Sequence, residues 1–187
     1  VHARSRLPAW VGRAALRLLP RRERPAWVCT VHGLYSVSAY SAVMTRGDAV
    51  IAVSESVASY LRQHYPGAAL DRLTVIPRGV DPEHFHRGRT DGAALIEALA
   101  DEHPALRRPY RIAIVGRLTR LKNHAVFLRL LRRLVDDGLD VGGMIVGGED
   151  PKHPGLAREL RELATRLALA DRVAWLGARS DVRPFMT

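Results

Sequence analysis

The segment IAIVGRLTRLKNHAVFL, residues 112–128, decides how the second half of this chain folds. Its apolar, β-branched start predicts a buried strand that ends at Gly116. Arg117 and Lys122 follow the glycine, and the apolar spacing after them predicts an amphipathic helix. Of the 29 Lys and Arg residues in the chain, only Lys122 and Lys152 are lysines. A lysine beside a strand end and a helix start raises the question of whether this turn binds an anion.

The same alternation of strand and helix extends in both directions from this segment. Short apolar runs predict strands at Trp27–Val31, Ala49–Val53, Leu73–Ile76, Ile112–Val115, Met144–Val146 and Val173–Leu176. Stretches with helical periodicity lie between most of these runs. Buried strands that alternate with helices predict an α/β fold in which a parallel sheet is covered by helices.

Two of the predicted helices have well-defined apolar faces. Between residues 122 and 137 this face consists of Phe127, Leu130, Leu131, Leu134 and Val135. Gly138 predicts the end of that helix. Between residues 155 and 168 the face consists of Leu156, Leu160, Leu163 and Leu167, and the i,i+4 spacing on the wet side pairs Glu162 with Arg158 and Arg166. The proline- and glycine-rich residues 77–92 interrupt the pattern and predict a loop or a connection between domains.

Composition narrows the class of protein. With 187 residues, 47% of them hydrophobic, the chain can form one domain or parts of two and is not typical of a disordered protein. Cys29 is the single cysteine, so no internal disulfide can form. No apolar run reaches the roughly 20 residues of a membrane-spanning helix. The net charge of +10 indicates an anionic partner, such as a nucleic acid, a lipid surface or a phosphorylated small molecule.

Glycines recur where the predicted strands end, and open parallel sheets bind ligands at that edge. The strand ends carry His32-Gly33, Pro77-Arg78-Gly79, Gly116-Arg117, Gly147-Gly148-Glu149-Asp150 and Gly177. One glycine in such a turn is ordinary. Its recurrence at successive strand ends indicates an edge that a ligand approaches closely.

The order and spacing of these segments resemble a known family. VIPRGVDPEHF (75–85), IVGRLTRLKN (114–123), IVGGED (145–150) and DRVAWLG (171–177) resemble motifs of the retaining glycosyltransferases with the GT-B fold (family 4), which include glycogen synthases, sucrose synthases and mannosyltransferases. The resemblance implies two Rossmann-like domains, both incomplete in this chain. Residues 1–79 would be the C-terminal part of the acceptor domain, and residues 80–187 the first half of the nucleotide-sugar donor domain. We therefore expect an internal fragment that is inactive on its own.

The resemblance also implies roles for particular residues. Gly116, Arg117 and Lys122 would bind the diphosphate of a nucleotide-sugar donor, and the two cations would stabilise the charge that grows on the departing phosphate. His32 would lie near the transferred sugar and hydrogen-bond a sugar hydroxyl or the diphosphate. A histidine that only caps a strand end is the alternative. His32, Arg117 and Lys122 are thus the candidate catalytic residues.

Further matched positions would complete the donor site. The nucleotide would contact Gly147, Gly148, Gly177, Ala178 and Arg179. Arg78 and Gly79 stand where the family often has Asn-Gly, and Arg78 would either reach the cleft between the domains or point to solvent. The other histidines lack metal-ligand spacing and are interpreted as surface or packing residues: His2, His64, His84, His86, His103, His124 and His153. We expect no metal ion and no cofactor, because the nucleotide-sugar is a substrate.

Residues 2–27 predict a basic, amphipathic first helix with Pro8 near its start and Pro20 at its end. Its cationic residues are Arg13 and Arg17 on one face, followed by Arg21, Arg22 and Arg24. Such a helix either lies on an anionic membrane surface or covers the sheet with a solvated basic edge. The sequence leaves both interpretations open.

These features predict a metal-independent enzyme that moves a sugar from a nucleoside-diphosphate sugar to a glycan or lipid-linked acceptor with retention of configuration. We expect it in the cytoplasm, with a peripheral position on the inner face of the plasma membrane as an option, in bacterial cell-surface polysaccharide or lipopolysaccharide synthesis. A catalytically inactive GT-B scaffold and a basic nucleic-acid-binding module are the alternatives. The nucleic-acid alternative is disfavoured, because only 6% of residues are aromatic and these are not interleaved with basic ones.

Overall fold

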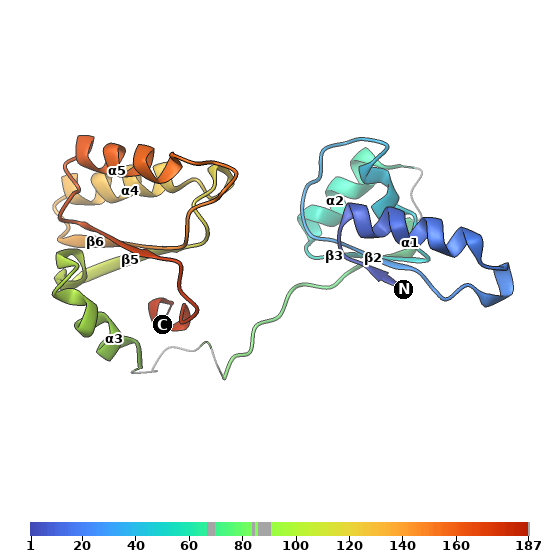
Figure 1. The fold of residues 1–187 in the computed structure, drawn as a ribbon, viewed down its shortest axis with the longest axis horizontal. Helices are drawn as coiled ribbons and strands as arrows, with labels where there is room; N and C mark the ends of the chain where they lie inside the picture. Colours follow the sequence, from blue (N-terminus) through green and yellow to red (C-terminus); the bar gives the residue numbers. More distant parts are fainter. Residues whose placement is uncertain (67–69, 84, 86–90, 187) are drawn as a thin grey trace. The chain divides into compact units, whose positions relative to one another are not determined.

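The computed structural model describes residues 1–66, 70–83, 85 and 91–186. These residues form two compact units, Val1–Gly79 and Val80–Thr187. Each unit has its own parallel sheet (Figure 1). His84, His86 and much of the predicted 77–92 loop lie outside the described residues.

The first unit is a four-stranded parallel sheet with the strand order β1-β2-β3-β4. Its strands are β1 (His2–Ala3), β2 (Val28–Val31), β3 (Ala49–Ala52) and β4 (Leu73–Val75). Helix α1 (Arg6–Leu18) follows β1, and α2 (Glu55–His64) follows β3. Figure 1 shows both helices on the same side of this sheet. The 3-10 turns are η1 (Arg21–Glu23), η2 (Ser41–Thr45) and η3 (Leu70–Arg72).

Burial along β3 follows the alternation expected of a sheet covered by helices on one face. In β3, Val50 and Ala52 are buried while Ala49 and Ile51 are half-buried. The hydroxyl of Ser54 accepts a hydrogen bond from the backbone N–H of Val57 at 3.2 Å, which caps α2 directly after β3. The cap explains why the chain leaves the sheet as a helix at this point.

The second unit is a three-stranded parallel sheet with the order β5-β6-β7. Its strands are β5 (Tyr110–Val115), β6 (Val141–Val146) and β7 (Val173–Gly177). Its helices are α3 (Asp91–Ala100), α4 (His124–Asp136) and α5 (Leu156–Arg166). Its 3-10 turns are η4 (Pro104–Arg107), η5 (Arg120–Lys122) and η6 (Arg183–Phe185).

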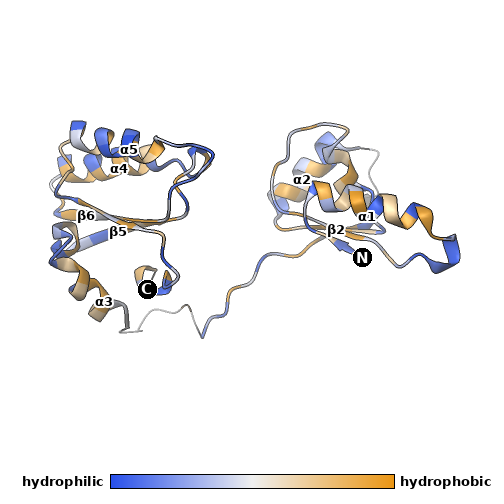
Figure 2. Ribbon diagram, in the orientation of Figure 1, coloured by the Kyte–Doolittle hydropathy of each residue, from blue (hydrophilic) through white to orange (hydrophobic). Residues whose placement is uncertain are grey.

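Helices cover both faces of this second sheet. Figure 1 shows α4 and α5 above β5 and β6, with α3 below them. The central strand β6 is buried along its whole length. Its Val141 and Ile145 belong to the core beneath α4 and α5, whereas Met144 and Val146 belong to the core that includes Leu106 of η4. The apolar residues of both sheets and the polar outer sides of α4 and α5 are visible in Figure 2.

Two glycines in β6 let the covering layers come close to the sheet. A Cβ atom at Gly142 would overlap the carbonyl oxygen of Ala105 in η4. A Cβ atom at Gly143 would lie 2.8 Å from Cδ2 of Leu131 in α4. Side chains at these two positions would push η4 and α4 away from the sheet.

Most predicted elements are present, and the differences concern single side chains and ion pairs. Leu130 was placed on the apolar face of α4, but its side chain is 49% exposed, and Leu128 is buried in its place. Arg158 and Glu162 pair at 3.8 Å, whereas Glu162 and Arg166 form no ion pair among the described residues. Helix α1 begins at Arg6, so Pro8 lies inside its first turn. None of the described helices is long and apolar enough to cross a membrane.

Candidate functional sites at the two sheet edges

The carboxyl ends of β5, β6 and β7 are held together by backbone hydrogen bonds. The N–H of Gly116 donates to the carbonyl of Val146 at 2.8 Å. The N–H of Leu118 donates to the carbonyl of Gly148 at 2.9 Å. The N–H of Gly147 donates to the carbonyl of Gly177 at 2.8 Å. These bonds extend the parallel pairing beyond the strands, so the glycine turns form one continuous edge.

The closeness of these turns requires glycine at Gly147. A Cβ atom there would overlap the carbonyl oxygen of Gly116. At Gly148, a Cβ atom would lie 3.1 Å from the Cβ atom of Ala178. Gly177 has a φ of 66°, in the left-handed region that favours glycine. The predicted nucleotide-contacting glycines are therefore positions where the backbone itself forms the surface of the site.

A pocket of 370 Å³ opens at this edge and is called here the strand-end pocket. It brings together most of the residues predicted for the donor site. Its lining is Val115, Gly116, Arg117, Val146, Gly147, Gly148, Glu149, Ala178, Arg179 and Val182. Lys122 does not line it, but its side chain lies over Gly116, because a Cβ atom at Gly116 would be 3.3 Å from Cε of Lys122.

Arg117 and Lys122 are both exposed, and neither forms an ion pair with another described residue. Lys122 ends η5, and Asn123 then takes a left-handed conformation with φ of 54° before α4 begins at His124. The side chain of Asn123 does not cap α4, and the first turn of α4 has no acidic residue. The backbone N–H groups at this helix start are thus without a side-chain cap, beside two unpaired cations.

Arg179 behaves differently from these two cations. Its Nε and Nη2 atoms donate to the two carboxylate oxygens of Asp181 at 2.8 and 2.6 Å. Its guanidinium also lies over the ring of Phe185, 5.2 Å from the ring centre. The hydrogen bond to Asp181 raises the pKa of Arg179. This pair, which the sequence did not predict, occupies the guanidinium and stabilises the turn after β7.

His124 is buried at the start of α4, and neither ring nitrogen has a hydrogen-bond partner of ordinary geometry among the described residues. Burial is the main cause that lowers its pKa, and the Lys122 charge lowers it further. The backbone of Gly116 acts in the opposite direction. His124 thus packs beneath the Gly116–Lys122 turn, in agreement with its interpretation as a packing residue.

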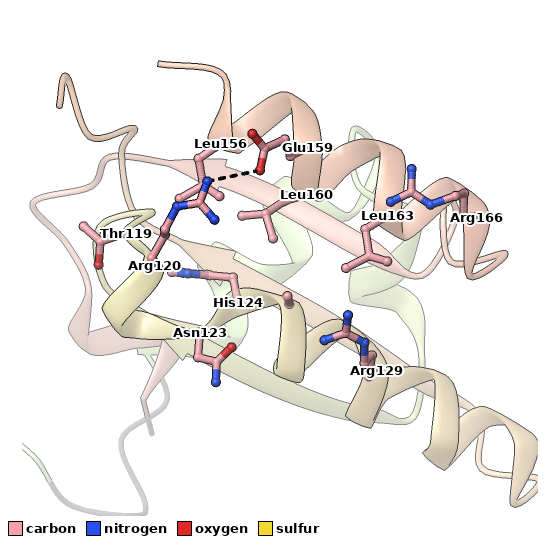
Figure 3. Close-up of a pocket in the computed structure, with 11 residues that line it drawn as sticks. Thr119, Arg120, Asn123, His124, Arg129, Leu156, Glu159, Leu160, Leu163 and Arg166 are labelled. Carbon is pink, nitrogen blue, oxygen red and sulfur yellow. Dashed lines mark ion pairs between the residues drawn. The ribbon is translucent and has the colours of Figure 1, made fainter. Parts of the chain in front are cut away.

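Figure 3 shows a second pocket, a groove of 280 Å³ between α4 and α5. Its floor includes Leu160 and Leu163, and Arg129 and Arg166 extend from the two helices on either side of it (Figure 3). At one end, Arg120 faces Glu159 across 3.9 Å. Neither Arg117 nor Lys122 lines this groove, so it is separate from the strand-end pocket.

A different site lies at the carboxyl edge of the first sheet, where Arg4, His32 and Arg78 form a basic cluster. His32 follows β2, Arg4 follows β1, and Arg78 comes shortly after β4. The Nη2 atom of Arg78 is 2.6 Å from Nδ1 of His32, and Nε of Arg4 is 3.4 Å from Nε2 of the same ring. The side chain of Arg78, for which the sequence left two orientations open, therefore contacts the predicted catalytic histidine.

The surroundings of His32 disfavour its protonated form. Burial is the first cause that lowers its pKa, followed by the charges of Arg78, Arg4 and His2. His2 itself is hydrogen-bonded to the hydroxyl of Thr30 at 2.7 Å. Gly79 is exposed, and a Cβ atom there would have no neighbour within 4 Å. Arg4 was not among the predicted site residues, although it belongs to the HARSR segment that directly follows the N-terminus.

Among the described residues, no group of three His, Cys, Asp or Glu side chains is arranged to hold a metal ion. Cys29 is fully buried in the first unit, and burial raises the pKa of its thiol to about 11. The thiol is therefore unsuited to nucleophilic chemistry at neutral pH.

Comparison with known proteins identifies the family of this chain. The model of the family "Glycosyltransferase Family 4" matches residues 1–84. A D-inositol 3-phosphate glycosyltransferase of Nocardia farcinica is 34% identical over 140 residues, which are 72% of this chain and 29% of that protein. An alpha-maltose-1-phosphate synthase of Mycolicibacterium smegmatis is 31% identical over 142 residues, 74% of this chain and 34% of that protein. The chain belongs to glycosyltransferase family 4.

Solved structures with a similar fold identify the architecture of this family 4 chain. A glycosyltransferase from Rickettsia africae matches with a TM-score of 0.74 and 27% identity, over 99% of this chain and 48% of that one. Anabaena HepE, solved in complex with UDP and glucose, matches with a TM-score of 0.80 and 21% identity, over 98% of this chain and 49% of that one. The predicted α/β fold with two parallel sheets is confirmed, and it corresponds to about half of these GT-B structures. The chain spans about 30% of the length of the curated relatives that it matches.

Proposed function

We propose that this family 4 chain carries the donor-diphosphate site, and part of the acceptor side, of an enzyme that transfers a sugar from a nucleoside-diphosphate sugar with retention of configuration. The observation that carries the proposal is the strand-end pocket, which Gly116, Arg117 and Gly147 line, together with the Lys122 side chain that lies against Gly116. In this assignment the second unit, Val80–Thr187, belongs to the donor domain and the first unit to the acceptor domain.

Electrostatics explain why such an edge suits a diphosphate. Breaking the bond between sugar and phosphate leaves additional negative charge on the departing nucleoside diphosphate. Arg117 and Lys122 offer two cations that pair with no carboxylate in the described part of the chain, and the start of α4 adds backbone N–H groups and the positive end of a helix dipole. Donors fixed in place before the reaction stabilise this growing charge without reorganising. The departing diphosphate can then assist the incoming hydroxyl, so the proposed mechanism uses no metal ion and no covalent nucleophile.

The nucleotide would lie along the glycine turns that follow β6 and β7. Gly147 and Gly148 have no side chain to keep a ligand away, and the main chain of Gly177 and Ala178 lies beside them. The Asp181 carboxylate holds Arg179, so we assign to Arg179 the shaping of this turn. His32, which Arg78 contacts within the first unit, would hydrogen-bond the transferred sugar.

The relatives support a nucleotide-sugar donor more strongly than any one acceptor. The HepE structure contains UDP and glucose, and the named curated relatives are a D-inositol 3-phosphate glycosyltransferase and an alpha-maltose-1-phosphate synthase. We propose a glycan or lipid-linked acceptor in bacterial cell-surface polysaccharide or lipopolysaccharide synthesis, at the cytoplasmic side of the membrane. A catalytically inactive member of the family is the second candidate. Both candidates would have the same nucleotide site.

The proposal is tested by titrating the chain with UDP and with GDP in a calorimeter. Arg117→Gln and Lys122→Met should each weaken binding of the preferred nucleotide about tenfold or more, because each removes a charge-assisted contact worth roughly 1.5–3 kcal/mol. Arg120→Gln is the matched control, since Arg120 lies in the same turn but faces Glu159 and does not line the strand-end pocket. An equal loss in all three variants, or no saturable binding by the unaltered chain, would sink the diphosphate assignment.

A further inference from the structure

The contacts in the basic cluster are electrostatically unbalanced. A neutral imidazole has one N–H donor and one acceptor nitrogen, so it can accept a hydrogen bond from only one guanidinium. Both nitrogens of His32 face a guanidinium, that of Arg78 at 2.6 Å and that of Arg4 at 3.4 Å. One of these contacts therefore brings two hydrogen-bond donors together, and protonating the ring would add a third positive charge.

No acidic side chain among the described residues relieves this excess. Neither Arg4 nor Arg78 forms an ion pair with any described carboxylate. The carboxylate that follows the neighbouring strand β3, Glu55 in the first turn of α2, pairs with neither of them. Arg4 and Arg78 are exposed, so their guanidinium groups remain accessible to a ligand from solvent.

The start of α1 adds a third source of positive potential at this edge. Only Arg4 and Ser5 separate β1 from this 13-residue helix, so its amino end lies at the carboxyl end of the strand. The Ser5 side chain does not cap the helix, and its first turn has no acidic residue. Its first backbone N–H groups therefore lack a side-chain acceptor.

We propose that this edge binds the phosphate group of a phosphorylated acceptor, with Arg4 and Arg78 contacting phosphate oxygens on either side of His32. The inference rests on the proposed function, because it names the acceptor class of that enzyme. A phosphate suits the cluster better than a carboxylate does. The two guanidinium groups follow different strands, and the start of α1 adds further N–H donors, so the donors are spread around the cluster. A phosphate dianion is tetrahedral and offers acceptor oxygens in several directions. A carboxylate is satisfied by one guanidinium.

The donor diphosphate is a less suitable occupant of this cluster. It has its own cations, Arg117 and Lys122, in the second unit, and these also lack carboxylate partners. Among the described residues, each unit thus has a set of cations without ion-pair partners at the carboxyl edge of its sheet. One set for the donor and one for the acceptor accounts for both.

The test follows the imidazole NMR signals of His32 while the chain is titrated with glucose 6-phosphate, with glucose, and with inorganic phosphate. Glucose 6-phosphate should shift these signals saturably and raise the pKa of His32, because an anion favours the imidazolium, whereas glucose should do neither. Arg4→Gln and Arg78→Gln should each weaken this binding about tenfold. Arg62→Gln, an exposed arginine of α2 in the same unit, should leave it unchanged and is the matched control.

Two further arms separate this inference from the proposed function. UDP binding, followed through the amide signals of Gly116 and Gly147, should be unaffected by Arg4→Gln and Arg78→Gln. Lys122→Met should weaken UDP binding and leave the glucose 6-phosphate response intact. The acceptor assignment would be overturned if inorganic phosphate bound but glucose 6-phosphate did not. It would also be overturned if Lys122→Met lost the glucose 6-phosphate response while Arg4→Gln and Arg78→Gln kept it. Failure of UDP to bind would contradict the proposed function. The His32 signals would still show whether glucose 6-phosphate binds, so the two outcomes are distinguishable.

Discussion

In the candidate donor site, Gly147 tolerates a side-chain change less well than the charged residues do. A methyl group there would overlap the carbonyl oxygen of Gly116, so Gly147→Ala must separate the ends of β5 and β6. Overpacking of this kind typically costs about 1–3 kcal/mol of folding free energy. We predict that Gly147→Ala lowers the stability of the second unit by about that amount in urea unfolding and abolishes detectable UDP binding.

Gly33→Ala is the matched control for this change. Gly33 also follows a strand end, but a Cβ atom there has no neighbour within 4 Å. The control should retain the stability and the UDP affinity of the unaltered chain. Normal UDP binding by Gly147→Ala would show that the glycine turns do not form the nucleotide surface.

Asp140 makes the stability of the second unit depend on acid pH. A hydrogen bond from Arg172 is the first cause that lowers its pKa, and Arg108 contributes through its charge and a hydrogen bond. A carboxyl whose pKa is lowered by folding stabilises the protein above its unfolded pKa, about 4, and this contribution is lost as pH falls through the lower folded value. Asp140→Asn should therefore reduce the melting temperature at pH 7, and the difference should vanish toward pH 2.

The control for the acid effect is Glu102→Gln, which removes an exposed carboxylate that forms no ion pair with a described residue. Its melting temperature should follow that of the unaltered chain at every pH. A constant difference between Asp140→Asn and the unaltered chain from pH 7 to pH 2 would argue against the assigned linkage.

At the scale of elements, the sequence predicted the strands and the site-bearing turns well, because both have local signals. β-branched runs mark the strands, and glycines mark the ends of β5, β6 and β7. It missed the start of β6, because Gly142 and Gly143 have low strand propensity and are required only by the packing of η4 and α4. It also missed β1, whose two residues carry no periodicity.

Side-chain partnerships were less predictable than elements, because they depend on which strand ends become neighbours. Arg4 joins His32 only because β1 pairs with β2 in parallel, placing His2 opposite Val28. Arg179 is occupied by Asp181 through the turn that follows β7. Neither contact has a spacing that sequence periodicity could reveal.

Helix α1 presents an apolar stripe to solvent, and exposed arginines lie on it and directly after it. Leu7, Val11 and Leu18 are 64%, 61% and 87% exposed, and alternating apolar and polar residues along α1 are visible in Figure 2. The exposed cations of this region include Arg17, Arg21 and Arg22. We predict that the chain sediments with vesicles containing phosphatidylglycerol, and that changing these three arginines to Glu abolishes sedimentation while UDP binding is retained.

The charge control for the membrane prediction lies in the second unit. Arg129, Arg158 and Arg166 are exposed on α4 and α5, and changing them to Glu alters the net charge equally. This variant should still sediment with the vesicles. Equal sedimentation by both charge-reversed variants would assign α1 the role of an ordinary sheet-covering helix.

At the scale of the whole molecule, the two units have separate cores. Cys29, with its fully buried thiol, belongs to the core of the first unit, and Gly142 lies in the second. We predict that the units unfold in distinct transitions. Gly142→Ala should lower the urea midpoint of the second unit, because its methyl group would overlap the carbonyl of Ala105, and leave the urea dependence of Cys29 labelling by a thiol reagent unchanged.

A single cooperative transition would contradict this independence. In that case Gly142→Ala would shift the labelling of Cys29 and the loss of helical circular dichroism together. Gly79→Ala, where an added Cβ atom has no neighbour within 4 Å, is the control and should change neither.

The central claim, that the second unit binds the diphosphate of a nucleotide, is tested most directly by mapping UDP onto the ¹⁵N-labelled chain by NMR. The predicted result is saturable shifts of the backbone amides of Gly116, Arg117, Gly147, Gly148 and Ala178, which vanish in Lys122→Met. Shifts that map instead to the arginines of α1, or to the groove between α4 and α5, would contradict the account.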